Sequence, residues 1–563
     1  MSSIGQSGNL SQSGNTIFLS GGSSGLDTAA LIEAAVKQRL READKIDVRI
    51  DENLAKYDGY STLQSLGSNL QSSLTALRKA YGFSSTDGSV YNQKAGTIAT
   101  NNSVDPQSIL GVNVTEDAAI GTNTIIVQNK AKSMRVASEY SADATAALGL
   151  NGDFDIRLEN SSWANISVAA GDSLNSIAAK INAASGDSNV SAQVIKTSEN
   201  EWQMVLTGLE TGQYMQTATG AGDNILQAIG VHDGGGAYQY ELQANENAQV
   251  LFNGVAVTRN SNVIDDLVEG VSLDIKNADP TTEITLDIGN DAPAVKDAIM
   301  NFVESYNALR DFVITNNQVS SDGTVSEDAV LYNDNIMKSL DSSLQGLFSI
   351  NFVTGAQETL REIGIEFDPN NKLKVDEIKL DNALLDDFGA VQALFQSQYS
   401  DDNAEFNITR NTSRNASLNF ALDITHDGTN ITNVSVGGDN SLFTVTGSTI
   451  KGNAGTIYEG LTFAYVGNTS TTVNVGFNQG FADLGANLLE NFTNNINGTI
   501  QSEKLSIESQ NENLDSRASR VRERAEAYRL SLIEKYARFE SQLSAAKATI
   551  NQIRAILGTN NDD

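Results

Sequence analysis

The residue types that could support catalysis are few, and their spacing forms no site. The sequence has no cysteine, which excludes disulfides, thiolate nucleophiles and cysteine-ligated metal. Its two histidines, His232 and His426, lie far apart in the chain, so they do not predict a histidine-based metal site. The 70 acidic residues include many carboxylate pairs, but no spacing singles out an acid and a base. We therefore assign no catalytic residue and expect a protein that is not an enzyme.

Two loops contain ligand-binding residue types but lack the rest of the motif. Gly234–Gly236 is not a phosphate loop, because no Lys-Ser/Thr follows it and no strand leads across it into a helix. The stretch 368–371, Asp-Pro-Asn-Asn, has calcium-type oxygen ligands, but the glycine and distal glutamate of an EF-hand are missing. We interpret it as a turn and expect no cofactor and no metal.

The acidic composition limits the partners. The formal net charge is −33 at pH 7, whereas phosphate binding needs a basic surface, so we expect no nucleic acid partner. Anionic membranes are disfavoured for the same reason, and no segment reaches the roughly 18 apolar residues of a membrane span. The acidity also fits a solvated surface without a dedicated partner.

Both ends of the chain have the periodicity of long amphipathic helices, which would position any binding surface. Between Ile500 and Leu557 apolar residues recur at steps of three or four without Pro or Gly, interrupted by Lys504 and Asn511. Two successive steps of four, from Tyr528 to Tyr536, form a stutter. At about 1.5 Å per residue this helix would be roughly 85 Å long. A stripe of this length needs a partner helix.

The N-terminal part supplies that partner. Asp27 is the predicted N-cap of a helix that ends at Gly82. Its apolar positions include Leu31, Val36, Leu40, Ala43, Ile46, Ile50, Leu54 and Tyr57. The two terminal helices can pack as an antiparallel pair. An ordinary helical hairpin is one interpretation; the length at both termini favours a stalk that also assembles with other chains.

The predicted fold class is α+β, with long terminal α-helices that form a coiled-coil stalk or leg and β-rich head domains inserted between them. The Ser/Gly/Asn-rich first residues cannot bury enough apolar surface to order themselves. The expected divisions are a disordered export region (1–25), N-terminal leg helices (26–82), a connector (83–119), β-rich head domains (120–285), a helical leg domain with short strands (286–400), an inserted β domain (401–478) and a C-terminal leg helix (479–563).

Several motifs, in order along the chain, resemble those of one known family. Ser24-Gly25-Leu26-Asp27 looks like its N-terminal signature, and residues 171–185 are similar to the flagellin hook IN motif. Residues 251–271 look like the family's hallmark hairpin, and residues 302–307 like the helix that follows it. The chain thus resembles the flagellar filament cap proteins, also called flagellar hook-associated protein 2 (FliD). The insert, 401–478, matches least.

The resemblance implies a cap at the distal end of the bacterial flagellar filament, with a role in cell motility. Such a cap is a homo-oligomeric ring, usually a pentamer, that promotes flagellin insertion and polymerisation and limits monomer loss. It implies extracellular localisation at the filament tip after flagellar type III export, with flagellin, a hook-junction protein and an export chaperone as partners besides further copies of the chain. The residues expected at the oligomer or filament interface are Leu26, Leu31, Val36, Leu40, Tyr528, Leu532, Phe539, Leu543, Ile550, Ile553 and Leu557.

An arginine-rich stretch stands out in this acidic chain. It contains Arg517, Arg520, Arg522 and Arg524, followed by Arg529. These residues would make an electrostatic contact with an acidic neighbour, either another subunit or flagellin. Alternatively, they form a solvated helix face with intrahelical pairs to nearby glutamates.

Two other functions stay open at this point. One is cell adhesion, with the Asn/Thr-rich insert binding a host mucin or glycan at the flagellar tip. The other is a different axial component, such as a hook-junction protein or a flagellin. The Gly25-Leu26-Asp27 start and the hallmark hairpin argue against this second alternative.

Overall fold

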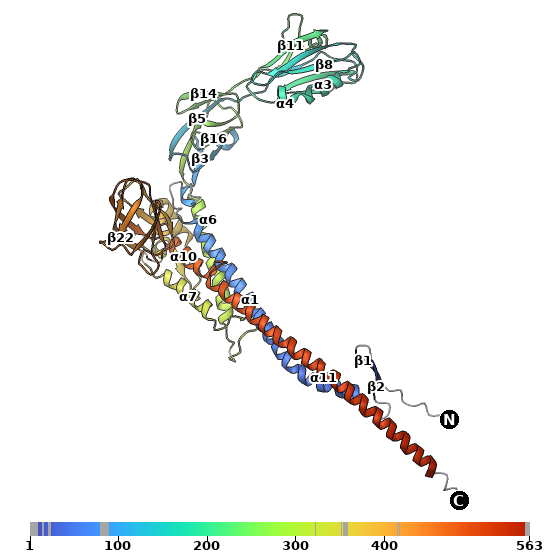
Figure 1. Cartoon of the computed structure of the whole chain (residues 1–563). Helices are drawn as coiled ribbons and strands as arrows, with labels where there is room; N and C mark the ends of the chain where they lie inside the picture. The colour runs from blue at the N-terminus through green and yellow to red at the C-terminus, as the bar shows by residue number, and fades with distance from the viewer. Residues whose placement is uncertain are drawn as a thin grey trace. The chain divides into compact units, whose positions relative to one another are not determined.

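The computed structural model describes residues 9–13, 16–20, 24–78, 89–320, 322–350, 352, 358–413, 415 and 417–557. The chain divides into two compact units, Met1–Asp87 with Lys296–Asp563 and Gly88–Val295. The predicted α+β class is confirmed, because two long terminal helices flank a β-rich middle (Figure 1).

The first unit contains the two longest helices, α1 (Thr28–Ala76) and α11 (Thr499–Leu557), of 49 and 59 residues. The Asp27 carboxylate caps α1 by accepting a hydrogen bond from the Ala30 amide at 3.0 Å. The predicted end at Gly82 is wrong for α1, which stops at Ala76 where the Leu77 amide turns back to the Leu74 carbonyl at 3.0 Å. Gly82 itself lies outside the described residues.

The predicted C-terminal helical region consists of two helices, α10 (Phe481–Thr493) and α11. Asn494 turns the chain between them, because its Oδ1 accepts from the amides of Ile496 and Asn497. Helix α1 continues alongside both. At Gly67 an added Cβ would lie 2.7 Å from the Thr493 side chain, so glycine permits the close approach of α1 to α10.

The rest of the helical part consists of short elements around α10. They are α6 (Ala292–Asn317), α7 (Asn335–Leu347), η2 (Leu360–Ile363), β18 (Ile365–Phe367), β19 (Leu373–Val375), α8 (Glu377–Asp386) and α9 (Phe388–Phe395). An aromatic cluster joins them: the Phe302 ring of α6 lies 5.4 Å from that of Phe481, and the Phe348 ring lies 5.1 Å from it.

The stretch predicted as an inserted β domain, 401–478, forms two antiparallel four-stranded sheets together with β20, which lies just before it. Their orders are β20-β27-β22-β23 and β21-β26-β25-β24. The strands are β20 (Gln398–Ser400), β21 (Phe406–Asn411), β22 (Ser417–His426), β23 (Ile431–Ser435), β24 (Phe443–Thr446), β25 (Thr449–Gly452), β26 (Leu461–Tyr465) and β27 (Thr471–Asn478). Alternate side chains of both sheets, among them Leu422, Phe463 and Val473, share one core.

The second unit contains four antiparallel sheets, ordered β14-β13-β5-β17-β3, β15-β16-β4, β12-β6-β10-β9 and β11-β7-β8. The strands are β3 (Lys94–Thr100), β4 (Leu110–Val114), β5 (Gly121–Asn129), β6 (Arg135–Ala137), β7 (Gly152–Leu158), β8 (Ala164–Val168), β9 (Val190–Ser198), β10 (Glu201–Gly208), β11 (Met215–Gly222), β12 (Tyr240–Gln243), β13 (Ala248–Phe252), β14 (Val255–Arg259), β15 (Val263–Val268), β16 (Val271–Ile275) and β17 (Ile284–Asn290). The short helices are η1 (Val90–Asn92), α2 (Pro106–Ile109), α3 (Leu174–Ala183), α4 (Ser185–Ser188) and α5 (Ile225–Ala228).

The structure differs from two of the expected divisions. The connector expected at 83–119 includes β3 and β4, which pair with β17 and β16 because their alternating residues fit a half-buried sheet. The disordered region expected at 1–25 includes β1 (Asn9–Ser13) and β2 (Thr16–Ser20), which pair as an antiparallel hairpin, and the Ile-Phe-Leu sequence at 17–19 lies within β2. Residues 1–8, 14–15 and 21–23 lie outside the described residues.

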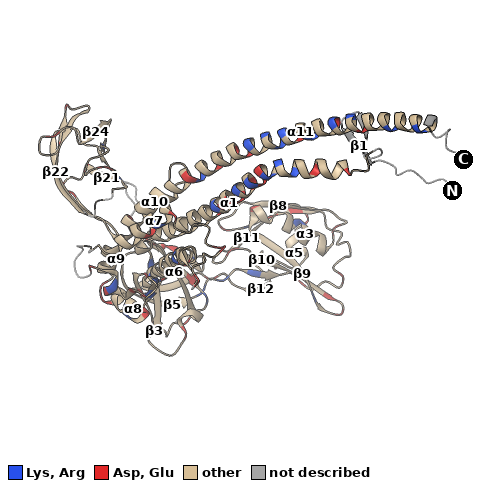
Figure 2. Ribbon diagram, turned by 90° about the horizontal axis from the view of Figure 1, so that it is seen from below, with Lys and Arg blue, Asp and Glu red and all other residues tan. Residues whose placement is uncertain are grey.

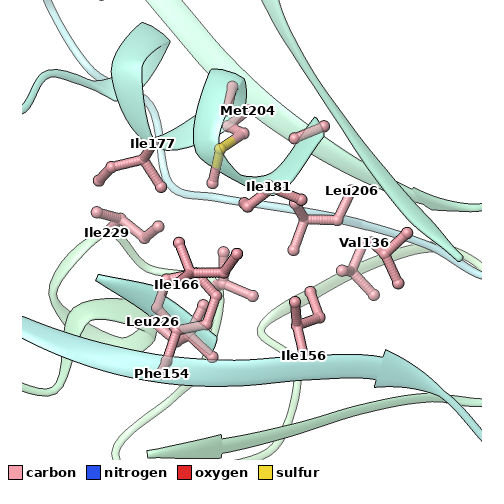
Figure 3. Close-up of a cluster of buried hydrophobic side chains, with 14 of the residues drawn as sticks. Val136, Phe154, Ile156, Ile166, Ile177, Ile181, Met204, Leu206, Leu226 and Ile229 are labelled. Carbon is pink, nitrogen blue, oxygen red and sulfur yellow. The ribbon is translucent and has the colours of Figure 1, made fainter. Parts of the chain in front are cut away.

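The motif at 171–185 forms one side of a buried core. Ser173 caps α3, and Ile177 and Ile181 of that helix point toward Phe154 and Ile166 of the facing strands (Figure 3). All four side chains are at most 2% exposed. The stretch thus forms helix α3, which directly follows strand β8.

Candidate functional site: the paired terminal helices

Helices α1 and α11 run antiparallel to one another, and we call this pair the shaft. The Arg39 guanidinium lies 3.8 Å from the centroid of the Tyr528 ring, Asn53 donates to Asn511 at 2.8 Å, and Lys504 lies over Tyr57. Partner numbers on α11 fall as those on α1 rise, which fixes the antiparallel sense. Figure 1 shows the two helices side by side.

The shaft has a narrow apolar seam that repeats every seven residues. Its buried centre comprises Ala43, Ile46, Ala518 and Val521, flanked by half-buried Ile50 and Leu514. The polar interruptions of the sequence pattern, Asn511 and Lys504, occupy seam positions and face Asn53 and Tyr57. A polar pair in such a seam selects one register at some cost in stability.

Gln64 of α1 lies at the end of the shaft, beside the break between α10 and α11. Its amide donates to the Thr493 carbonyl and to Asn495 Oδ1, both at 3.0 Å, while its Oε1 accepts from Lys504 at 3.2 Å. The last carbonyls of a helix lack intrahelical partners, so a side chain from α1 satisfies one of them. This side chain is 7% exposed, and the helix break is therefore held in place by α1.

The distal part of α11 has no helix packed along it within the described residues. The amide of Ser24 donates to Glu540 Oε2 at 3.1 Å and its hydroxyl donates to Oε1, which places the start of α1 beside this residue. Strand β2 also contacts α11. From 541 to 555 every side chain is exposed except the half-buried Leu543. Ile550 and Ile553 are 49% and 48% exposed.

The predicted interface residues fall into three groups. Leu26, Leu31, Phe539, Ile550 and Ile553 are exposed; Val36, Leu40, Tyr528, Leu532 and Leu543 are half-buried; Leu557 ends α11, and its side chain lies outside the description. The first group is available to another molecule. In the second group, Leu543 lies on the distal part of α11, and the other four lie where α1 and α11 pack together. Their role in an interface stays a prediction.

The four predicted arginines do not form a single patch. Arg522 Nη2 donates to Asp47 Oδ1 at 2.6 Å, and this carboxylate raises the pKa of Arg522. Arg517, Arg520 and Arg524 lie on the other side of the seam, because they follow helical spacing of three and four. Among these arginines, in the part of the chain that the structure describes, Arg529 alone has the expected intrahelical pair, with Glu526 at 3.6 Å.

Sequence reasoning missed several buried positions of the shaft, among them Ile32, Ile533 and Glu540. Ile32 is 7% exposed, whereas the predicted Leu31 beside it is 47% exposed. Ile533 and Glu540 are 9% and 5% exposed. Ile32 could have been found, since it continues the seven-residue repeat of Ile46. Glu540 could not, because its partner Ser24 precedes α1.

The described residues contain no group of three or more His, Cys, Asp or Glu side chains placed to hold a metal ion. Of the two histidines, His232 is buried against Thr217 at 3.0 Å, and its burial lowers its pKa. A cavity of about 520 Å³ by α7 and α10 is lined by serine, threonine, asparagine, glycine and apolar residues, without an ionisable side chain. No helix in the described ranges combines the length and apolarity that a bilayer span requires.

Comparison with protein families decides the relationship. The family description "Flagellar hook-associated protein 2 C-terminus" matches residues 245–548, more than half of the chain. The chain belongs to the flagellar hook-associated protein 2 family. The N-terminus model of the same family matches residues 24–134, and the flagellin hook IN motif matches residues 151–208, which span β7 to β10 with α3.

Relatives of this family have modest identity to the chain. Flagellar hook-associated protein 2 of Salmonella typhimurium is 29% identical over 215 residues, which cover 37% of this chain and 46% of the relative. That of Aeromonas caviae is 25% identical and is covered to 81%, against 67% of this chain. The chain thus matches less than half the length of the Salmonella protein. A solved structure of the Escherichia coli flagellar cap protein FliD has a TM-score of 0.46 at 25% identity, with 60% of this chain and 90% of that chain covered.

Proposed function

We propose that this chain caps the distal end of the bacterial flagellar filament and acts there as a structural assembly factor rather than as an enzyme. Copies of the chain form a ring, with five as the expected number, that promotes flagellin insertion and limits loss of flagellin from the filament end. Family membership supports the flagellar role.

The observation that carries the proposal is the exposed apolar stripe on the distal part of α11. Ile550 and Ile553 are about half exposed and take no part in the seam with α1. Apolar side chains that stay in contact with water cost free energy, and this cost is removed when another surface covers them. We assign this stripe, with Leu543 and Phe539, to contact with neighbouring subunits or flagellin.

The route to the filament tip belongs to the same proposal. The chain leaves the cell through the flagellar type III pathway, with residues 1–25 as its leading export segment, and it has no cysteine that could cross-link during passage. An export chaperone and a hook-junction protein are its further partners. The working domain limits of this proposal are the predicted divisions apart from the connector, because β3 and β4 within 83–119 pair with β17 and β16.

Truncation tests the assignment. A chain ending at residue 549 loses Ile550 and Ile553, and we expect cells that carry it in place of the full chain to release flagellin into the medium and to lose motility. The matched control is deletion of 558–563 alone, which leaves α11 intact and should preserve motility. Tryptophan fluorescence follows folding of the second unit, since Trp163 and Trp202 both lie there. Normal filaments from a stably expressed 549-residue chain would contradict the proposal.

A further inference from the structure

The shaft has two flanks of opposite charge, one on each side of its seam. One flank, the acidic flank, contains Asp44, Asp47, Asp51 and Asp58 of α1 with Glu508, Glu512, Asp515 and Glu526 of α11. The other, the basic flank, contains Lys45, Arg49 and Lys56 of α1 with Arg517, Arg520 and Arg524 of α11. Figure 2 shows Lys and Arg gathered along both helices.

The contacts within the shaft identify the acidic flank. Arg522 is paired with Asp47 across the seam, and the carboxylates of Asp515 and Asp44 further favour its charged form. Arg529 pairs with Glu526 one turn along. Arg522 and Arg529 therefore neutralise only part of eight carboxylates, and the flank stays acidic.

The basic flank holds cations that the shaft itself does not neutralise. Arg517, Arg520 and Arg524 are exposed, and within the described residues none of them forms an ion pair; Arg524 Nε donates to the Arg520 carbonyl at 3.2 Å. Only Glu42 and Glu52 of α1 lie among the basic residues of this flank. The excess is unusual in a chain with a net charge of −33.

The two flanks lie at the same height on the shaft. Residues 44–58 and 508–526 of the acidic flank span the same turns as 45–56 and 517–524 of the basic flank. A second copy placed beside the first, without an axial shift, therefore sets its acidic flank against the first copy's basic flank. Such a contact uses different surfaces on the two partners, so repeating it closes a ring when the rotation between copies permits.

We propose that the shafts of neighbouring copies pack side by side, with the basic flank of one copy on the acidic flank of the next. The inference rests on the proposed ring of copies and names the surface that builds it. Flagellin is the alternative occupant of the basic flank. Complementary potentials align partners and speed association, even where each exposed ion pair contributes little.

Charge reversal on purified full-length chain tests the contact. The basic-flank variant carries Arg517→Glu, Arg520→Glu and Arg524→Glu; the acidic-flank variant carries Asp44→Lys, Asp51→Lys and Glu512→Lys. Each alone should raise the dissociation constant for self-association by roughly tenfold or more, measured by analytical ultracentrifugation at low salt. An equimolar mixture of the two should recover pairwise association, because each variant then presents the charge that the other needs. A closed ring of five would keep one like-charged contact, so the heterodimer is the species to measure. Arg41→Glu with Glu523→Lys, on the outer faces, is the matched control.

The outcomes separate this contact from the capping function. Self-association that is unchanged in both variants, or a mixture that stays as weak as its components, overturns the flank contact. If self-association is unchanged but the basic-flank variant fails to cap filaments, the arginines meet flagellin and the second-copy assignment is wrong. Failure of the wild-type chain to cap filaments contradicts the proposed function whatever the variants do. Helical ellipticity at 222 nm verifies that each variant has folded.

Discussion

Arg78 Nε lies 2.9 Å from Asp483 Oδ1, and the aspartate side chain is fully buried. The pair joins the end of α1 to α10. Asp483 Oδ2 also accepts from the Ser397 amide at 3.0 Å, and Arg78 donates to Asn487 Oδ1 at 3.2 Å. One ion pair therefore ties the shaft to the residues that lead into the two four-stranded sheets.

Removing the charge of Asp483 should destabilise the first unit. Asp483→Asn keeps the shape but leaves the Arg78 guanidinium, 21% exposed, without a carboxylate. Loss of one partner of a buried pair costs about 3–5 kcal/mol, and the partial exposure of Arg78 favours the lower end. Urea unfolding followed at 222 nm should show the loss. Tryptophan fluorescence of the same samples is an internal control, because both tryptophans lie in the second unit and their transition should not move.

The Asn53–Asn511 pair should stabilise the shaft through its mutual hydrogen bond. Either single change to Ala leaves one half-buried amide unpaired and should cost about 1 kcal/mol. Changing both residues to Leu should raise stability but weaken the choice of register. A double-mutant cycle with urea measures the coupling. Strictly additive single effects would show that the 2.8 Å contact contributes nothing.

Neighbouring positions near the start of α1 should separate the seam from the free surface. Ile32→Ser removes a buried seam side chain and should destabilise the shaft by about 2–4 kcal/mol, whereas Leu31→Ser should leave its melting nearly unchanged. In a motility rescue, Leu31→Ser should nevertheless reduce function if this residue contacts another molecule. Equal melting of the two variants would contradict the placement of the seam.

These two neighbours also show how far sequence reasoning reached. The step from Leu31 to Val36 is five residues, and it departs from the rhythm that Ile32, Val36, Arg39, Ala43 and Ile46 keep. Arg39 and Asn53 are polar residues at seam positions, so a search for apolar residues passed over the true repeat. The antiparallel pairing of α1 with α11 was predictable, because it follows from the length and the apolar periodicity of the two terminal helices.

Local backbone chemistry explains what else the sequence could reveal. The hairpin within residues 251–271 is readable locally, because its Asn253-Gly254 turn needs positive φ at both residues, and these are 50° and 79°. The break after α10 has a local signal in Asn494, whose Oδ1 accepts from the Ile496 and Asn497 amides, and a second support in Gln64 on α1, which is remote in sequence. The separation of Arg522 from the other arginines was likewise set by Asp47, on a different helix.

Alkaline pH should weaken the first unit through Tyr306. Burial raises the pKa of this phenol to about 12, against about 10 in an unfolded chain. The stability that it contributes is therefore complete below pH 10 and is lost as the pH rises from about 10 to about 12. Tyr306→Phe should flatten this loss, measured by urea midpoints at 222 nm from pH 9 to 11. Tyr332→Phe, at an exposed position, is the matched control for removing a tyrosine hydroxyl.

Destabilising the core between α3 and its facing strands should shift the unfolding of the second unit and leave that of the first unit unchanged. Ile181→Ala opens a cavity beside Ile166 and should cost about 2–4 kcal/mol in the second unit. Tryptophan fluorescence should report the shift, while ellipticity of the long helices should keep its own midpoint. Ile195→Ala on the exposed side of β9 is the control and should be nearly neutral.

In the distal turns of α11, selection for binding to another molecule can act separately from selection for folding. Side chains such as Ile550 and Ile553 contribute almost nothing to the folding of their own chain, so substitutions there would pass unnoticed in any assay of the isolated protein. Substitutions in a few terminal turns could thus change the binding partner during evolution, while the fold of the rest of the molecule stays the same.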